Sequence, residues 1–392
     1  MKPIITFLLL CSFSLISPRV FANEPVDVAI GYVYQKRDLN YILSMKEDNF
    51  KPAILLAISD FNKSTFAQKK NITVHLKEYA ANNKTIDLQR TYLRAVNDGV
   101  IAILGIPTSK EALLVGKLAQ ESKVLTFSMS GSHNKIGQFG EYLYSGSGSL
   151  SSNNKIILSK IFNNRKPKNV LVITDQNDPF SSGFADRVLK SLETLPNNYQ
   201  MLHVAKKAVF SQEQIDSITS TNYDFIIISI YTYNGVRLLN ELTNSKIITN
   251  QPIIVPGAWY YDNSALKHIK NSPNLYSITT LSTSWIDKNA SLFTKRINKS
   301  LHRSTKPNDI LAYDITQMIL KSLPKASTIN REQIKNAFLQ IKGTYKGIAG
   351  PYFYDNCNGH PRKNIFLLKL TDNFSFKTIH SSISVKDSSC TQ

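Results

Sequence analysis

A repeated unit between Val100 and Ser132 constrains the fold of this chain more than any other feature of its sequence. Two short apolar runs, 100–104 and 124–127, each stop at a cluster of small hydroxyl residues, and a helix-like stretch, 110–122, separates them. This pattern predicts a β-α-β unit, whose two strands lie parallel in one sheet. The carboxyl ends of parallel strands form the edge where such sheets bind ligands. We therefore expect four hydroxyl side chains to face one crevice there, those of Thr108, Ser109, Ser130 and Ser132.

A helix that begins at this edge also offers free N–H groups and a partial positive charge, which suit an anion. The alternative for the four hydroxyl residues is that they cap helices, as Ser and Thr commonly do. Ser109, which stands directly before the helix-like stretch, fits both roles.

The first 22 residues read as a secretory signal peptide. Lys2 supplies a positive start, residues 4–10 are apolar, and Val20 and Ala22 are the small residues before a cleavage site. The apolar stretch is too short to span a bilayer. The alternative to a cleaved signal peptide is a lipoprotein anchor at Cys11. Leu10, however, is too bulky for the position before a lipidated cysteine. We expect a soluble, exported mature protein.

Removal of the signal leaves two cysteines, Cys357 and Cys390, both near the end of the chain. In an exported protein such a pair is expected to form a disulfide. This bridge would tie the C-terminal tail to the turn at 355–360. The alternative is two unpaired, buried thiols.

The chain is strongly basic, with a formal net charge of +19. The signal contains two of the basic residues and no acidic ones, so the mature protein carries +17. Such a charge is compatible with nucleic acid, an anionic membrane or an acidic partner. The lysines are spread along the chain, however, without a basic block or interleaved aromatic residues. We therefore expect a basic soluble surface and no nucleic-acid partner.

The alternation of strands and helices extends beyond the opening unit. A length of 392 residues exceeds one average core and suits two lobes. The pattern predicts an α/β fold with mostly parallel sheets. A small, flexible stretch at 142–149 separates the two halves. Strands are expected at 26–34, 72–79, 169–174, 199–204, 224–230, 252–255 and 275–281, helices at 52–62, 85–98, 180–195, 211–220, 235–243, 288–302, 307–323 and 330–341, and short antiparallel strands after Gly350.

This arrangement resembles the type 1 periplasmic binding proteins of the leucine/isoleucine/valine-binding branch. The likeness covers nearly all of the mature chain and rests on motifs in the family's order. They are the strand Val28–Gly31, the helix Ala57–Asn62, the turn Ile103–Ser109, the segment Phe127–Ser132, the turn Asp178–Gly183, Ala312-Tyr313-Asp314 and the closing Gly350–Asp355 with Gly359.

The resemblance implies two Rossmann-like lobes joined by three crossings, near 145–149, 279–284 and 345–347. The N-terminal lobe would comprise 23–145 plus 282–345, and the C-terminal lobe 146–281 plus 346–392. The ligand would lie between the lobes, which close on it like a hinge. The family implies a periplasmic location, an ABC permease as partner, no cofactor, and a protein that we expect to be a monomer.

The resemblance also implies roles for single residues. Thr108 and Ser109 correspond to hydroxyls that hold an amino acid's carboxylate, and Ser130 and Ser132 to residues that bind carboxylate and amine. Phe180 replaces a family tyrosine.

The loop at 256–261 departs from the family because it lacks the acid that holds the ligand's ammonium group. An unpaired buried ammonium is costly, which argues against an ordinary α-amino acid. Trp259 indicates instead a flat or apolar ligand part, or a cation–π contact. Tyr231, after strand 224–230, would line the same wall.

Signals of catalysis are weak. Ser132 and Lys135 match a Ser-x-x-Lys spacing, but the companion Lys-Thr-Gly is absent from the sequence, and the seven histidines show no metal-ligand spacing. We expect neither an enzyme nor a metal site. The sequence predicts a solute-binding protein that captures an amino-acid-like or amide ligand for an ABC importer. The alternative is a ligand-free envelope protein of this fold that regulates a cell-wall enzyme by protein contact.

Overall fold

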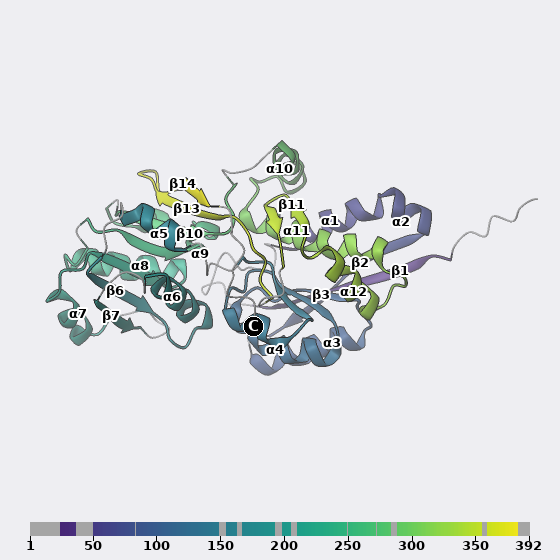
Figure 1. Ribbon diagram of the computed structural model, residues 1–392, viewed down its shortest axis with the longest axis horizontal. Coiled ribbons are helices and arrows are strands. Elements are labelled where there is room, and N and C mark those ends of the chain that lie inside the picture. Colours follow the sequence, from purple (N-terminus) through teal and green to yellow (C-terminus); the bar gives the residue numbers. More distant parts are fainter. Residues whose placement is uncertain are drawn as a thin grey trace, which may run out of the picture.

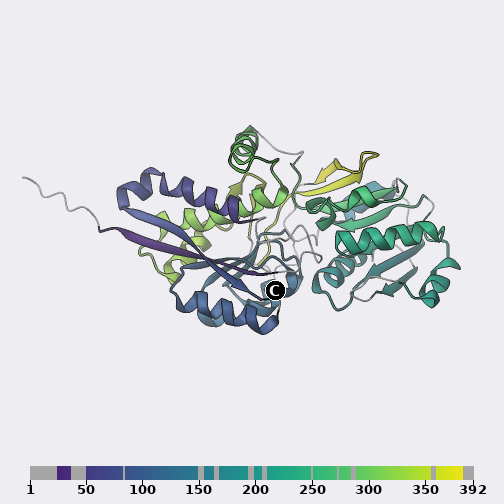
Figure 2. The same ribbon diagram turned by 180° about the vertical axis from the view of Figure 1, so that it is seen from behind.

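Two parallel-stranded sheets, set side by side along the long axis of the molecule, form the framework of the protein (Figure 1). The view from behind shows the same two-lobed arrangement (Figure 2). The computed structural model describes residues 24–36, 50–82, 84–148, 154–162, 167–192, 198–204, 210–248, 250–271, 273–283, 288–354 and 359–382. The predicted α/β fold with two lobes is confirmed.

The first lobe is built on a five-stranded sheet of order β2-β1-β3-β4-β5, in which all neighbours are parallel. The opening β-α-β unit is confirmed, since β3 and β4 pair directly and α4 connects them. Its strands are β1 (Val26–Gln35), β2 (Ile72–Ala81), β3 (Ala102–Gly105), β4 (Leu125–Ser128) and β5 (Leu143–Ser145). Its first helices are α1 (Lys51–Asn62), α2 (Thr65–Lys70), α3 (Thr85–Asn97) and α4 (Ser109–Ser122), followed by the 3-10 turn η3 (Asn134–Phe139).

Three helices from late in the sequence complete the first lobe. They are α10 (Lys288–Leu301), α11 (Pro307–Ser322) and α12 (Arg331–Ile341), with a 3-10 turn η6 (Leu323–Lys325) between the last two. Residues of α1, α11 and α12 share one hydrophobic core on one face of the sheet, and α3 and α4 cover the other face (Figure 1). Both faces are therefore buried, as the near-continuous apolar strands require.

The second lobe contains a seven-stranded sheet of order β14-β13-β10-β9-β8-β6-β7. The last two strands run antiparallel, which confirms the short antiparallel strands expected at the end of the chain. The strands are β6 (Asn169–Thr174), β7 (Asn198–His203), β8 (Phe225–Ser229), β9 (Ile253–Pro256), β10 (Leu275–Thr279), β13 (Ile365–Leu370) and β14 (Phe376–Ser382). The helices are α5 (Asn154–Phe162), α6 (Pro179–Leu192), α7 (Gln212–Thr219), α8 (Thr232–Asn244) and α9 (Ala258–Tyr261), with the 3-10 turn η4 (Leu266–His268).

One segment that we expected to cross between the lobes belongs to the first lobe instead. Tyr345–Gly347 is β11, which forms a hairpin with β12 (Gly350–Tyr352). Tyr345 and Tyr352 are buried in the first-lobe core, so hydrophobic burial keeps this hairpin there and the chain crosses later. Leu143–Ser145 pairs with β4 as a fifth strand, which we did not expect, but it lies within the expected bounds 23–145 of the first lobe.

The described parts of the three connections between the sheets meet at one place. A Cβ atom added to Gly148 would lie 2.9 Å from Cγ2 of Thr280 and 3.1 Å from Cβ of Lys363, which belong to the other two connections. The N–H of Ser145 donates to the carbonyl of Gly359 at 2.7 Å. The three connections therefore meet at one junction between the two sheets.

Two predictions fall outside the described residues: the signal peptide at 1–22 and the disulfide between Cys357 and Cys390. Within the part of the chain that the structure describes, none of the helices combines the length and hydropathy needed to span a membrane. No group of three or more His, Cys, Asp or Glu side chains in that part is arranged to hold a metal ion.

Candidate functional site

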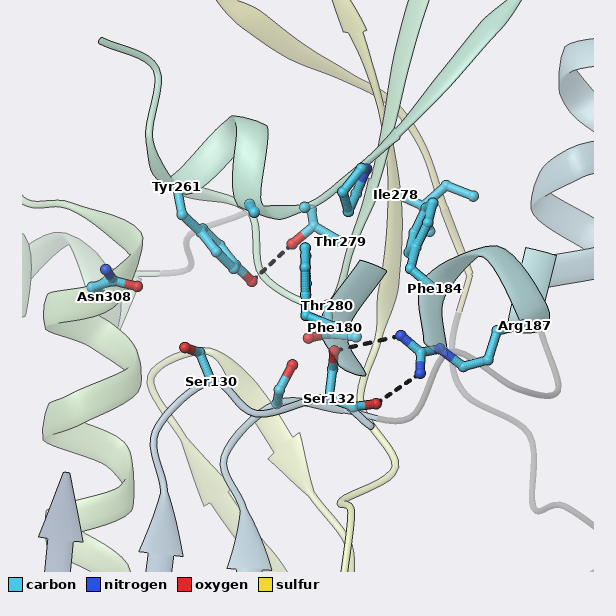
Figure 3. Close-up of a pocket in the computed structure, with 14 residues that line it drawn as sticks. Ser130, Ser132, Phe180, Phe184, Arg187, Tyr261, Ile278, Thr279, Thr280 and Asn308 are labelled. Carbon is cyan, nitrogen blue, oxygen red and sulfur yellow. Dashed lines mark hydrogen bonds between the residues drawn. The ribbon is translucent and has the colours of Figure 1, made fainter. Parts of the chain in front are cut away.

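A pocket lies between the two lobes, beside the hinge (Figure 3). Its open space, including the part that reaches solvent, is about 570 Å³. The first lobe contributes residues after β4 and one residue of α11, and the second lobe contributes α6, the end of β9, α9 and β10. The lining residues are Ser130, Ser132, Ser147, Phe180, Phe184, Arg187, Pro256, Gly257, Ala258, Tyr261, Ile278, Thr279, Thr280 and Asn308.

Two of the four predicted hydroxyl residues, Ser130 and Ser132, line the pocket from the first lobe. Ser130 Oγ donates to the carbonyl of Pro107 at 2.5 Å. The N–H of Ser132 donates to Ser109 Oγ at 3.0 Å. These bonds join the loop after β4 to the loop after β3, so the adjacent strand ends act as one rigid edge.

The other two predicted hydroxyls do not line the pocket, because the chain uses them itself. Thr108 is the N-cap of α4 and forms a reciprocal capping box with Glu111. The Glu111 carboxylate accepts from the N–H of Thr108 at 2.9 Å and from its hydroxyl at 2.6 Å. Ser109 is almost fully buried and accepts from the loop of Ser132. The anion that we expected at this helix N-terminus is therefore a side chain of the protein.

We expect Thr108→Ala to lower the free energy of unfolding of the first lobe by about 1 kcal/mol, since it removes an N-cap. We also expect it to leave ligand affinity unchanged, because Thr108 is outside the pocket. Urea unfolding and calorimetric titration measure the two quantities. Ser64→Ala, which removes the N-cap of α2 in the same lobe, is the matched control. If Thr108→Ala lowered ligand affinity and Ser64→Ala did not, the prediction would be wrong and the Thr108 hydroxyl would belong to the binding site.

The second lobe supplies an apolar wall on α6. Phe180 and Phe184 are one helical turn apart and both face the pocket (Figure 3). Tyr231 stacks on Phe180, with ring centroids 4.5 Å apart and an interplanar angle of 17°. Tyr231 thus supports the ring of Phe180. We predicted that Tyr231 itself would line the pocket, but it is not one of the lining residues.

Trp259, which we expected to contact a ligand, does not line the pocket. Its side chain is 0% exposed and belongs to the hydrophobic core of the second lobe. Its indole N–H donates to the carbonyl of Ile230 at 2.8 Å. The ring packs onto Gly235 of α8, where an added Cβ would lie 2.2 Å from it. The neighbouring Tyr261 reaches the pocket instead, and its hydroxyl accepts from Thr279 Oγ1 at 2.8 Å.

Arg187 is the charged residue of the pocket that the sequence analysis missed. It lies on α6 and is only 4% exposed. Its Nη1 donates to the carbonyl of Ser132 at 2.8 Å, which connects the lobes across the pocket (Figure 3). Burial lowers the pKa of Arg187 to about 10. The sequence did contain a signal for this position. Phe180, Phe184 and Arg187 have the spacing of one helical face, so a face that turns Phe180 toward the pocket also turns Arg187 toward it.

The Ser-x-x-Lys spacing has no catalytic arrangement here. Ser132 Oγ lies 3.4 Å from Nη2 of Arg187, which donates to it, and Lys135 is exposed. A hydroxyl that accepts from a cation has no base in this contact to activate it. The arrangement of the pocket suits binding.

Comparison with known proteins agrees with this geometry. The family model described as periplasmic binding protein matches residues 47–375. No match to this chain was found among curated proteins.

Solved structures share the fold at low sequence identity. A leucine binding protein, LivK, from Thermotoga maritima is 16% identical with a TM-score of 0.75, and the match covers 91% of this chain and 98% of that one. LivJ from Streptococcus pneumoniae, a branched-chain amino acid transporter substrate binding protein in complex with isoleucine, is 17% identical with a TM-score of 0.74 over 92% and 99%. An ABC transporter solute binding protein from Rhodopseudomonas palustris, in complex with 3,4-dihydroxybenzoic acid, is 17% identical with a TM-score of 0.73 over 93% and 99%.

Proposed function

Because this chain belongs to the periplasmic binding protein family, we propose that it captures a small organic solute between its lobes for an ABC importer. One observation carries the proposal: a pocket lined by residues of both lobes, which include Ser147 and Thr280 of the connections between them. A ligand there contacts both lobes at once, so its binding favours the closed arrangement. Capture of the solute, without chemical conversion, is the function that follows.

The rest of the assignment extends the same proposal. Family membership supports a periplasmic location, in agreement with the signal peptide predicted at 1–22. A permease in the inner membrane would recognise the closed, loaded protein, which we take to act as a monomer. Amino acids and aromatic acids are the ligands of the structural neighbours. We propose a ligand of that size with an apolar body and one acidic or amide head, which suits the apolar α6 wall and the polar rim opposite.

Ligand binding is expected to stabilise the protein measurably. A ligand at one hundred times its dissociation constant adds about 2.7 kcal/mol to the free energy of unfolding. Thermal-shift screening of amino acids, amides and aromatic or aliphatic acids, followed by calorimetric titration, tests this. Phe180→Ala should weaken binding, whereas Tyr199→Ala, an exposed aromatic residue on β7, should not.

An absence of binding across the whole panel would overturn the proposal. Recovery of a cell-wall synthase instead of a permease from envelope extract would then favour the alternative, a ligand-free regulator. Recovery of the permease only when ligand is present supports the importer.

A further inference from the structure

The guanidinium of Arg187 is a buried cation that no described carboxylate pairs with. Its contacts are Nη1 to the Ser132 carbonyl at 2.8 Å and Nη2 to Ser132 Oγ at 3.4 Å. Its buried Nε has no hydrogen-bond partner among the described residues. A guanidinium carries five N–H donors, and three of those of Arg187 have no acceptor among the described residues. Asp186, the nearest acid in the sequence, is exposed and acts on Arg187 only at a distance.

A buried charge without a partner is strongly unfavourable, and a pocket that contains one is built for the opposite charge. We propose that the ligand is an apolar monocarboxylate without an ammonium group, whose carboxylate binds Arg187 while its body packs on Phe180 and Phe184. This inference rests on the proposed function and narrows it to one ligand class. Arginine suits the role because its planar fork matches a carboxylate in two parallel hydrogen bonds.

The same pocket offers nothing to neutralise an ammonium group. None of its lining residues is acidic, and Arg187 is the one that carries a charge. Two acids next to other lining residues in the sequence, Asp262 and Asp309, are engaged by neighbouring side chains. The Asp262 carboxylate accepts from Ser264 Oγ at 2.7 Å. That of Asp309 accepts two hydrogen bonds from Arg303, each 2.8 Å long. An amino acid would therefore place its ammonium beside a cation in a largely apolar site.

The first lobe does not supply a competing carboxylate site at α4. The Glu111 carboxylate already occupies the cap of that helix through the N–H and hydroxyl of Thr108. A second carboxylate at the same N-terminus would meet this negative charge. Arg187 is thus the group that remains for the ligand's charge, and it sits beside the polar edge made by Ser130 and Ser132.

Pairs of ligands with identical carbon skeletons test the inference by calorimetric titration. The acids are 4-methylpentanoate and 3-phenylpropanoate, and their amine-bearing partners are leucine and phenylalanine. We expect at least one acid to bind at least about tenfold more tightly than its amine-bearing partner, because the ammonium is left buried without a countercharge. We also expect 3-phenylpropanamide, which lacks the negative charge, to bind more weakly than the acid.

Arg187 variants test the residue itself. Arg187→Gln should weaken acid binding at least about tenfold and weaken amide binding clearly less, since the ion pair with the guanidinium is lost only for the acid. Arg187→Lys should keep part of the preference. Arg237→Gln, which removes an exposed arginine of the same lobe, is the matched control. The acid-against-amide ratio separates a charge effect from a general loss of structure.

The outcomes distinguish this inference from the proposed function. Tight binding of leucine or phenylalanine with weak binding of both acids would overturn the inference and leave solute capture intact. Equal losses for acid and amide in Arg187→Gln would also overturn it. No binding by any member of the panel would remove both proposals together.

Discussion

Gly105→Ala is expected to destabilise the first lobe by about 3 to 5 kcal/mol, because two costs add at this residue. Gly105 ends β3 with a φ of +106°, a conformation that side-chain-bearing residues rarely adopt. An added Cβ would also lie 2.0 Å from the carbonyl oxygen of Val33, which is main chain and has little freedom to move. That carbonyl accepts from the N–H of Ile106 at 3.0 Å, so displacing it disturbs β1 as well.

Urea unfolding monitored by circular dichroism measures this loss. Gly99→Ala is the matched control, since Gly99 has a φ of +77° but no atom within 4 Å of an added Cβ. Backbone strain alone should cost Gly99→Ala about 1 kcal/mol. Equal losses in the two variants would show that the contact with Val33 relaxes without cost.

Asp314→Asn is the second change with a large expected effect, about 3 to 5 kcal/mol, because it removes the negative charge that compensates a buried lysine. Asp314 lies on α11 and is fully buried. Its carboxylate accepts from the N–H of Ile348 at 2.7 Å and from that of Ala349 at 2.9 Å. It is also the negative charge that acts on the buried Lys363, whose Nζ lies 3.8 Å from the ring centroid of Tyr352.

We expect the loss of folding stability in Asp314→Asn to be larger at pH 6 than at pH 9. Burial lowers the pKa of Lys363, and the Asp314 charge partly offsets this. Without Asp314 the pKa of Lys363 in the folded state falls further below its unfolded value. As the pH falls, Lys363 therefore binds its proton in the unfolded state before it does so in the folded state. This difference lowers the stability of the variant from pH 9 to pH 6. The variant should therefore be closer to the parent protein at pH 9.

A double-mutant cycle checks the cause. Lys363→Met removes the cation, so Asp314→Asn combined with Lys363→Met should be more stable at pH 6 than Asp314→Asn alone. A penalty that is the same at both pH values, and that Lys363→Met does not relieve, would contradict the assigned coupling.

Much of the fold follows from local pattern. Alternating strands and helices, with apolar strands buried on both faces, predict two parallel sheets, and the structure contains them. The short strand Leu143–Ser145 was missed because three residues carry too little periodicity, and its pairing with β4 is a non-local contact.

The pocket was predictable in part. The loops after β3 and β4 had to come together, since their strands are neighbours, and Ser130 and Ser132 reach the pocket as expected. The burial of Trp259 was not predictable in this way, since an aromatic residue at a strand end suits a core as well as a ligand. The capping role of Thr108 was the alternative that the sequence left open, because Thr108 and Glu111 have the local spacing of a capping box.

The sequence by itself determined the strand order along the chain, the two-lobed α/β class and the edge at which small hydroxyl residues collect, because each depends on local periodicity and on the direction of parallel strands. Only the tertiary structure decided which side chains face the pocket. Arg187 is a buried cation because α6 packs against the loop of Ser132, and this contact encloses the guanidinium between the lobes. Burial and the lack of a partner carboxylate are properties of that packing, and no window of sequence contains both surfaces.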